Sequence, residues 1–118
     1  MSSRRALDIW EREMILSLIQ HAPSNCAALA QQLTFAEAED QQDSDIALFV
    51  CDDGRIERPA FSGVCAEAVY RDVDGNEASL LLHVDRGVLY WLERLKLYPS
   101  PLVITKPDIS AIERFVIP

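Results

Sequence analysis

The sequence has few of the residues that most catalytic and cofactor-binding motifs require. It contains only 4 glycines, widely scattered, so no glycine-rich phosphate-binding loop is present. The nucleophile motif GxSxG is also absent. The 2 histidines, His21 and His83, each lack a second histidine three or four positions away, the spacing of a local metal-binding pair. No motif therefore assigns an activity, and we expect no enzyme, no metal and no cofactor.

Cysteines and long apolar runs are scarce as well. Cys26, Cys51 and Cys65 make an odd number without CxxC spacing, which argues against a disulfide framework and fits a reducing compartment. We expect all three to be small buried residues. A charged segment follows the N-terminal MSSRR, so no signal peptide is predicted, and no apolar run approaches the ~20 residues of a membrane span. The sequence predicts a cytoplasmic protein.

Basic residues are few, with 11 Lys and Arg against 19 Asp and Glu and a net charge of −8. Such a chain repels nucleic acid and anionic membranes, so neither is expected as a direct partner. No Lys or Arg occurs between Arg12 and Arg55. The acidic stretch within this range comprises Glu37, Glu39, Asp40, Asp43, Asp45, Asp52 and Asp53. It has two interpretations: a solvated loop, or a docking face for a basic protein.

The N-terminal part of the chain predicts helices. Asp8 and Glu11 have the spacing of a capping box, and apolar residues then recur every three or four positions. This pattern predicts a helix from Ile9 to about His21 that stops before Pro23. The following PSNCAALAQQL indicates a shorter second helix, which Ser24 or Asn25 would cap.

The remainder predicts strands. The runs IALFV, VCAEAVYR, ASLLLHV and VLYWLERL have strand length and composition, and LTFAEAE is a further short strand. Prolines interrupt the tail, which leaves LVIT and IERFVI as short edge segments at most. We expect one α+β domain over residues 1–118, with one or two N-terminal helices packed on an antiparallel β-meander of about four to five strands. The predicted core comprises Trp10, Met14, Leu18, Leu29, Leu48, Val69, Leu80, Leu82 and Leu89.

The segment DVDGNE, residues 72–77, raises the question of a calcium loop. If Gly75 is aligned with the glycine of an EF-hand loop, Asp72 and Asp74 match ligand positions. However, the first ligand position then falls on Tyr70 and the last, which needs a glutamate, falls on Leu81. The segment therefore predicts a turn rather than a metal site.

Aspartate followed by glycine between apolar runs is a strong hairpin signal. If Asp74 and Gly75 form a two-residue turn, Val69 lies opposite Leu80, and Cys65 lies opposite Val84. Glu67 would then face Leu82.

Two stretches carry a family resemblance: RALDIWEREMILSLI, and AEAVYRDVDGNEASLLLHVDRGVLYWLERLKLYPSPLV. Together they resemble a group of small uncharacterised bacterial proteins. That group looks like an acid-capped helix followed by a meander with a D-x-D-G turn. The resemblance omits about residues 26–62, and YPSP departs from an expected glycine-containing turn. Small acidic α+β proteins of this kind are often similar to immunity proteins, which neutralise a toxin from a competing bacterium.

This resemblance implies a binding protein whose partner is a cognate toxin, for instance a basic nuclease domain. The partner-binding residues would be those of the acidic stretch, with Phe49 or Phe61 as apolar anchors. The protein itself would be a monomer or a weak homodimer.

The alternative is a small enzyme or ligand-binding protein with its site between helices and sheet. Its candidate residues are His83, Tyr70, Glu67 and Glu93, which all lie on predicted strands.

Overall fold

The computed structural model describes residues 3–51, 54–97 and 100–118. Within these ranges the helices are α1 (Ile9–Gln20) and α2 (Leu29–Gln32). The strands are β1 (Arg5–Ala6), β2 (Ala36–Asp40), β3 (Ile46–Val50), β4 (Gly63–Arg71), β5 (Glu77–Asp85), β6 (Val88–Leu95) and β7 (Arg114–Val116). Single 3-10 turns cover Ser24–Cys26, Leu33–Phe35, Gln42–Ser44 and Ile109–Ala111.

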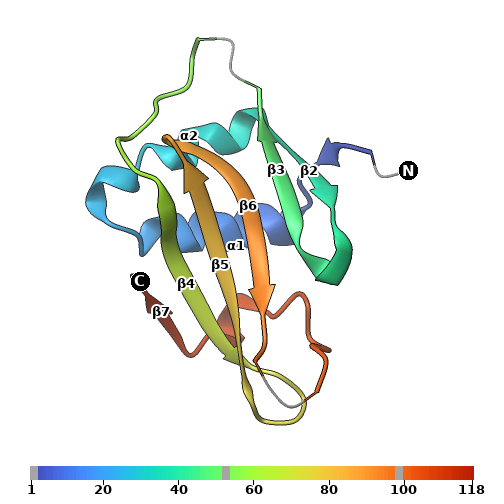
Figure 1. The fold of residues 1–118 in the computed structure, drawn as a ribbon. Coiled ribbons are helices and arrows are strands. Elements are labelled where there is room, and N and C mark those ends of the chain that lie inside the picture. The colour runs from blue at the N-terminus through green and yellow to red at the C-terminus, as the bar shows by residue number, and fades with distance from the viewer. Residues whose placement is uncertain (1–2, 52–53, 98–99) are drawn as a thin grey trace.

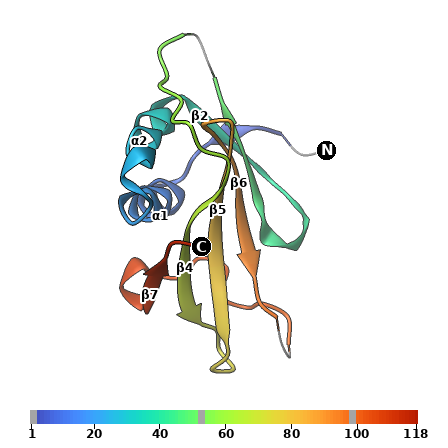
Figure 2. The ribbon, with the colours of Figure 1, turned by 60° about the vertical axis from the view of Figure 1, so that its left-hand side comes forward.

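The strands form one antiparallel sheet in the order β1-β2-β3-β6-β5-β4-β7. Both helices lie on the same face of this sheet (Figures 1 and 2). The predicted α+β class is confirmed, but the described sheet has seven strands instead of four to five. The additional strands are the edges β1 and β7, which have 2 and 3 residues. β7 lies within IERFVI, which the sequence predicted as a short edge segment at most, whereas LVIT forms no strand. β1 carries too few residues for an alternating pattern to be recognised.

The capping box at the start of α1 is present as predicted. The Asp8 carboxylate accepts a hydrogen bond from the Glu11 N–H at 2.7 Å, and the Glu11 carboxylate accepts one from the Asp8 N–H at 2.8 Å. Glu11 is fully buried, although it interrupts the apolar stripe, because both its oxygens accept hydrogen bonds from the Arg5 guanidinium at 2.7 Å. The helix ends at Gln20, and His21 is its C-cap.

The second helix is shorter than predicted. Only Leu29–Gln32 is α-helical, with a 3-10 turn before and after it, and neither Ser24 nor Asn25 provides a side-chain cap. Cys26, Leu29, Ala30 and Leu33 would share one face of the predicted helix, and all but the partly buried Ala30 are buried. In the described part of the chain no helix has the length and apolar character needed to cross a lipid bilayer.

The hydrophobic core fills the space between the helices and the sheet. Of the predicted core residues it contains Met14, Leu18, Leu29, Leu48, Leu80, Leu82 and Leu89. Trp10 is only partly buried at the edge of the core, where its indole N–H donates to the Pro107 carbonyl oxygen at 2.7 Å. Val69 is buried but lies outside the core, because its neighbours Ala68 and Tyr70 take the core-facing positions of β4.

One expectation about cysteine is wrong. Cys26 and Cys65 are buried, as expected, whereas Cys51 is exposed directly after β3. All three thiols are free.

The β4–β5 hairpin forms, but with a different register. Arg71 pairs with Glu77, and the Asp72 N–H donates to the Asn76 carbonyl oxygen at 2.9 Å, which leaves a three-residue loop, residues 73–75. Within it the Gly75 N–H donates to the Asp72 carbonyl oxygen at 2.9 Å, and Gly75 has φ +81°. This arrangement is typical of a type I turn followed by a left-handed glycine. Val69 therefore lies opposite Ser79 instead of Leu80, and the predicted two-residue turn is wrong here.

The register also changes the partners of Cys65 and Glu67. Cys65 has no partner on β5, because an irregularity lies between Val64 and Ala66. Glu67 faces Leu81 instead of Leu82. A two-residue turn with positive φ at both positions does occur in the next hairpin, at Arg86 (φ 49°) and Gly87 (φ 76°).

The sheet is split between β3 and β6. These strands pair only where Ile46 faces Leu92 and Ala47 faces Trp91. Beyond that point the side chain of Gln32, which is fully buried, bonds to the backbone of the β5–β6 hairpin. The helical layer thus provides hydrogen bonds where the neighbouring strand is missing.

Candidate protein-binding face

The face of the sheet opposite the helices is covered by no described helix or strand (Figure 2). Strand alternation decides which side chains it carries: on β5, Leu80 and Leu82 point into the core, so Leu81 and His83 point to the other side. We call this surface the open face. Cross-strand pairing gives its residues as Glu37, Glu39, Ala47, Phe49, Glu67, Val69, Ser79, Leu81, His83, Trp91, Glu93 and Leu95.

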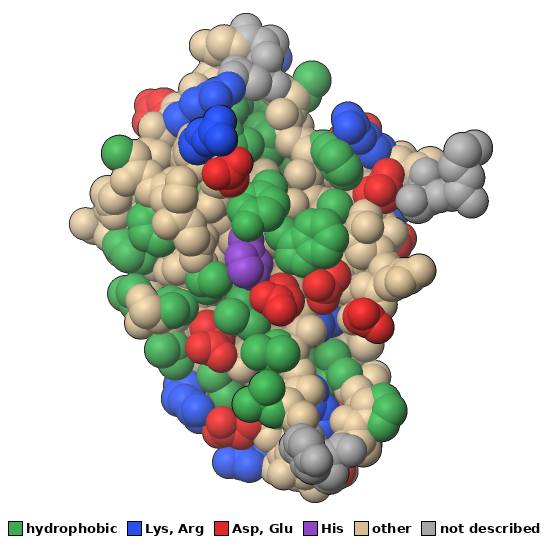
Figure 3. Space-filling view, viewed as in Figure 1, with side chains coloured by type: hydrophobic (Ala, Val, Ile, Leu, Met, Phe, Trp, Pro, Cys, Tyr) green, Lys and Arg blue, Asp and Glu red, His purple; other side chains and the backbone are tan. Residues whose placement is uncertain are grey.

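The centre of the open face is apolar and aromatic. Trp91 lies between Ala47 on β3 and His83 on β5 in one cross-strand row. The His83 ring meets the Tyr90 ring edge-on at 5.9 Å, and its Nε2 is 2.8 Å from a Glu93 carboxylate oxygen. Figure 3 shows hydrophobic side chains gathered around a histidine on this face, with acidic side chains beside them.

Three of the predicted partner-binding residues lie on the open face. Glu37 and Phe49 are directly opposite each other on β2 and β3, and Glu39 is opposite Ala47. The Arg4 guanidinium lies over the ring of Phe49, 3.8 Å from its centroid, and so covers part of this side chain. This is a cation–π contact within the chain.

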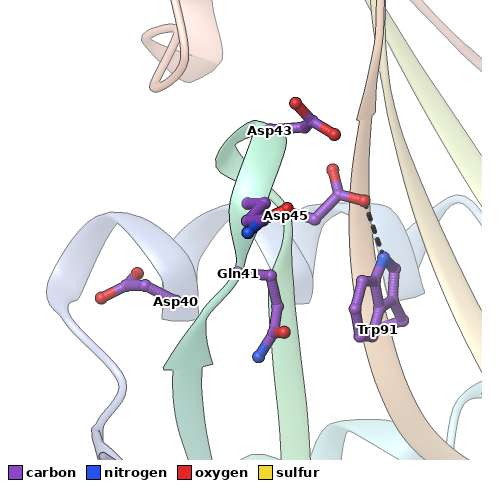
Figure 4. Close-up of a pocket in the computed structure, with 6 residues that line it drawn as sticks. Asp40, Gln41, Asp43, Asp45 and Trp91 are labelled. Atoms are coloured by element: carbon purple, nitrogen blue, oxygen red, sulfur yellow. Dashed lines mark hydrogen bonds between the residues drawn. The ribbon is translucent and has the colours of Figure 1, made fainter. Parts of the chain in front are cut away.

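Asp43 and Asp45 lie in the loop between β2 and β3, at the edge of the open face. Together with Asp40, Gln41, Gln42 and Trp91 they line a shallow hollow. Asp45 accepts hydrogen bonds from the Trp91 indole N–H at 2.9 Å and from the Arg94 backbone N–H at 2.8 Å (Figure 4). Asp43 has a left-handed backbone with φ 61°, which holds the loop in a tight bend.

Asp40 belongs to the other side of the sheet. Its partner on β3 is Ile46, a core residue, and in Figure 4 its carboxylate points away from Trp91. Arg5 donates to both its oxygens, at 2.8 and 3.2 Å. These hydrogen bonds from Arg5 lower the pKa of Asp40. Its charge is therefore already matched by a cation of the same chain.

Three predicted partner-binding residues remain. Asp52 and Asp53 lie outside the described residues. Phe61 is partly buried and packs against the hydrophobic core, so it is not a free anchor. The structure thus brings together only part of the acidic stretch on one surface.

Charges differ between the two halves of the open face. At the β4–β5–β7 side, Arg114 pairs with Glu77 at 2.9 Å and Arg71 pairs with Glu113 at 3.1 Å, so these charges compensate one another, while Glu67 has no ion pair among the described residues. On β2 and in the following loop, the carboxylates of Glu37, Glu39 and Asp43 have no ion pair with any Lys or Arg among residues 3–51, 54–97 and 100–118.

The DVDGNE segment has a structural role. The buried Asp72 carboxylate accepts hydrogen bonds from Lys96 at 2.8 Å and from the backbone N–H groups of Val103 and Ile104 at 2.9 and 2.8 Å. Burial alone would raise the pKa of Asp72, but these hydrogen bonds outweigh it and hold the pKa well below its usual range. The same Lys96 also binds Asp74 at 2.8 Å. The loop therefore anchors the tail of the chain to the sheet.

The four residues considered for an enzyme site are divided between the two faces of the sheet. Tyr70 points to the helical side, where its hydroxyl donates to the Ile104 carbonyl oxygen at 2.6 Å, and burial raises its pKa to about 12. His83, Glu93 and Glu67 lie on the open face instead. The space between helices and sheet is filled by apolar core residues.

The open face does have a signal in the sequence. In ASLLLHV and VLYWLERL, apolar residues occur at both odd and even positions and therefore on both sides of the strand, which is typical of a strand buried on both sides. In the structure one of these sides has no cover, which leaves Leu81, Tyr90, Trp91 and Leu95 on it or at its border.

The fold and this face together define an α+β protein with a single helical layer and an uncovered, partly apolar sheet surface. The chain belongs to the family described as a domain of unknown function, DUF6984, whose model matches residues 4–106. No curated protein and no solved structure matches the chain.

Proposed function

We propose that this protein binds another protein through its open face, and that it is an immunity protein that neutralises a cognate bacterial toxin. The observation that carries the proposal is the apolar and aromatic centre of the sheet, which lies beside carboxylates that form no ion pair with the described Lys and Arg residues. Exposed apolar patches with a polar border mark protein interaction sites.

The face has the two components that a tight protein interface uses. Trp91 and Tyr90 supply aromatic surface, the residue type that most often dominates binding energy at the centre of an interface. Glu37 and Glu39 supply negative charge at one border. A toxin that acts on nucleic acid carries a basic surface to hold phosphates, so an acidic inhibitor would be steered towards it and would cover it.

The test is co-purification with the product of the adjacent gene, together with protection of cells that express that product. We expect a complex at micromolar concentration and restored growth. Tyr90→Ala, which truncates an aromatic ring that is 42% exposed, should weaken both. Leu16→Ala on the outer side of α1, where the side chain is 38% exposed, is the matched control and should change neither. Absence of complex and of protection would overturn the proposal.

A further inference from the structure

We propose that the β2–β3–β6 half of the open face binds arginine side chains of a basic protein partner, with one guanidinium placed against Trp91 beside Asp43. This half is defined by Glu37, Glu39, Ala47, Phe49 and Trp91, with the adjoining hollow. The identity of the partner as a toxin rests on the function proposed above, whereas the chemistry of the surface does not.

Charge complementarity selects this half. Its carboxylates Glu37, Glu39 and Asp43 have no ion pair with the described Lys and Arg residues, so a cationic partner would not have to displace one. The β4–β5–β7 half offers a cationic partner less, because Arg71 and Arg114 already pair with Glu113 and Glu77, which leaves Glu67 as its carboxylate without an ion pair among the described residues. Compensated pairs of this kind contribute little attraction.

The same half already holds a guanidinium of its own chain. Arg4 lies over the Phe49 ring at 3.8 Å, and Phe49 is the cross-strand neighbour of Glu37. A planar cation therefore fits against an aromatic ring on this part of the sheet. The planar, weakly hydrated guanidinium stacks on aromatic faces better than the strongly hydrated ammonium group of lysine, so arginine is the expected ligand.

Trp91 provides a second aromatic surface of this type, and it is fixed in place. Its indole N–H donates to Asp45, whose other oxygen accepts from the Arg94 backbone N–H, so neither side chain has to be ordered on binding. The hollow beside it is lined by carboxylate and amide groups (Figure 4). Carboxylates are the groups that pair with arginine through paired hydrogen bonds.

The experiment is a titration of the 15N-labelled protein with the peptide Ac-Gly-Arg-Gly-Arg-Gly-NH2 at low salt, followed by NMR. We expect saturable shifts of the Trp91 indole N–H signal and of the Ala47 and Phe49 amides. The lysine analogue of the peptide should bind several-fold more weakly. Asp43→Asn should weaken binding several-fold, whereas Glu67→Gln, on the other half of the open face, should leave it unchanged.

The proposal is overturned if the peptide gives no saturable shifts, if the shifts lie on β4, β5 and β7, if both variants weaken binding equally, or if the lysine analogue binds equally well. These outcomes are separable from the fate of the proposed function. A toxin complex without peptide binding removes the arginine site and leaves the immunity function. Peptide binding at Trp91 without a toxin complex does the reverse.

Discussion

Gln32 and Leu89 are joined by a hydrogen bond between a side chain of the helical layer and the backbone of a central strand. The Leu89 N–H donates to the Gln32 side-chain oxygen at 3.0 Å, and the Gln32 side-chain nitrogen donates to the carbonyl oxygens of Gly87 at 2.7 Å and Glu57 at 3.0 Å. A buried backbone group without a partner is costly. Gln32 removes that cost where β3 and β6 separate.

Replacing Gln32 by Ala should lower the free energy of unfolding by about 3 kcal/mol, because buried N–H and C=O groups of the β5–β6 hairpin would lose their partner. Denaturant titration measures the loss. Gln31→Ala is the matched control: Gln31 also bonds to backbone groups, of Arg55 and Glu57, but in an exposed setting where water can replace it. Equal losses in the two variants would contradict this role of Gln32.

Replacing Asp72 by Asn should destabilise the protein by about 2 kcal/mol at neutral pH. The amide keeps only one oxygen, so one of the buried N–H groups of Val103 and Ile104 loses its acceptor, and Lys96 keeps only Asp74 as a counter-ion. The pKa of Asp72 is lowered in the folded protein, so its contribution is fully present above the unfolded pKa of about 4 and is lost as the pH falls through the folded pKa. The difference in melting temperature between wild type and variant should therefore shrink below about pH 4. A difference that stays constant down to pH 2 would contradict the pairing.

Asp74→Asn is the control for that experiment. Asp74 accepts hydrogen bonds from Lys96 and from its own turn, at the Asn76 N–H, and Asn retains the turn bond. The variant should fold with a smaller loss than Asp72→Asn. For both variants we expect the melting temperature to be insensitive to added calcium, as in the wild type; a calcium-dependent rise in the wild type that the variants lose would show a metal site.

The loss of stability on truncation of leucines should distinguish positions that face the core from positions on the open face. Leu18→Ala and Leu82→Ala, both fully buried, should each cost about 2–5 kcal/mol. Leu81→Ala, one residue away but on the open face, should cost clearly less because its side chain is only partly buried. Chemical denaturation of the three variants checks the assignment, and an equal loss at Leu81 would show that the open face is covered.

Arg94 should be replaceable by Met without loss of stability. Its Nε and Nη2 atoms are buried and have no hydrogen-bond partner in the described structure, and burial lowers its pKa. The backbone N–H of residue 94 would still bind Asp45. We expect the free energy of unfolding to stay constant or to rise by about 1 kcal/mol. A loss above about 2 kcal/mol would show that the contact of the guanidinium with the Trp10 ring outweighs its desolvation.

The double reversal Glu37→Lys and Glu39→Lys should slow association with a basic partner and flatten its salt dependence, because both carboxylates lie on the open face. Melting temperature should change little, since no described Lys or Arg pairs with either residue. Stopped-flow binding at low and high salt measures the effect. A wild-type association rate with an unchanged salt dependence would mean that these residues are only solvated and take no part in binding.

A structural feature of this protein can be predicted from the sequence when the residues that form it are close together along the chain. The capping box of α1 is decided within four residues, Asp8 to Glu11, so its pattern is sufficient. The register of the β4–β5 hairpin depends on whether Gly75 closes a two- or a three-residue loop, and the sequence allows both. The edge segment IERFVI was predicted from its composition, but its pairing with β4 as strand β7 depends on a contact distant in sequence, which local propensity does not encode.

The candidate site shows the same limit. The acidic residues were visible as a run, but a β-strand alternates, so β2 directs Glu37 and Glu39 to the open face and Asp40 to Arg5 on the other side. The aromatic centre at Trp91 comes from a strand far along the chain. Only the pairing of β3 with β6 brings the two together.

The contacts at the start of α1 also constrain when this molecule can finish folding during synthesis. Trp10 donates to Pro107 across 97 residues, and Asp8 binds Lys106 across 98 residues. At a translation rate of about 5–20 residues per second, these partners emerge about 5–20 s after the helix. The strands β4, β5 and β6, against which α1 packs, emerge earlier within that interval, so the contacts of Asp8 and Trp10 with Lys106 and Pro107 form last. The N-terminal end of α1 therefore gains its full set of hydrogen-bond partners only after residues 106 and 107 have been synthesised.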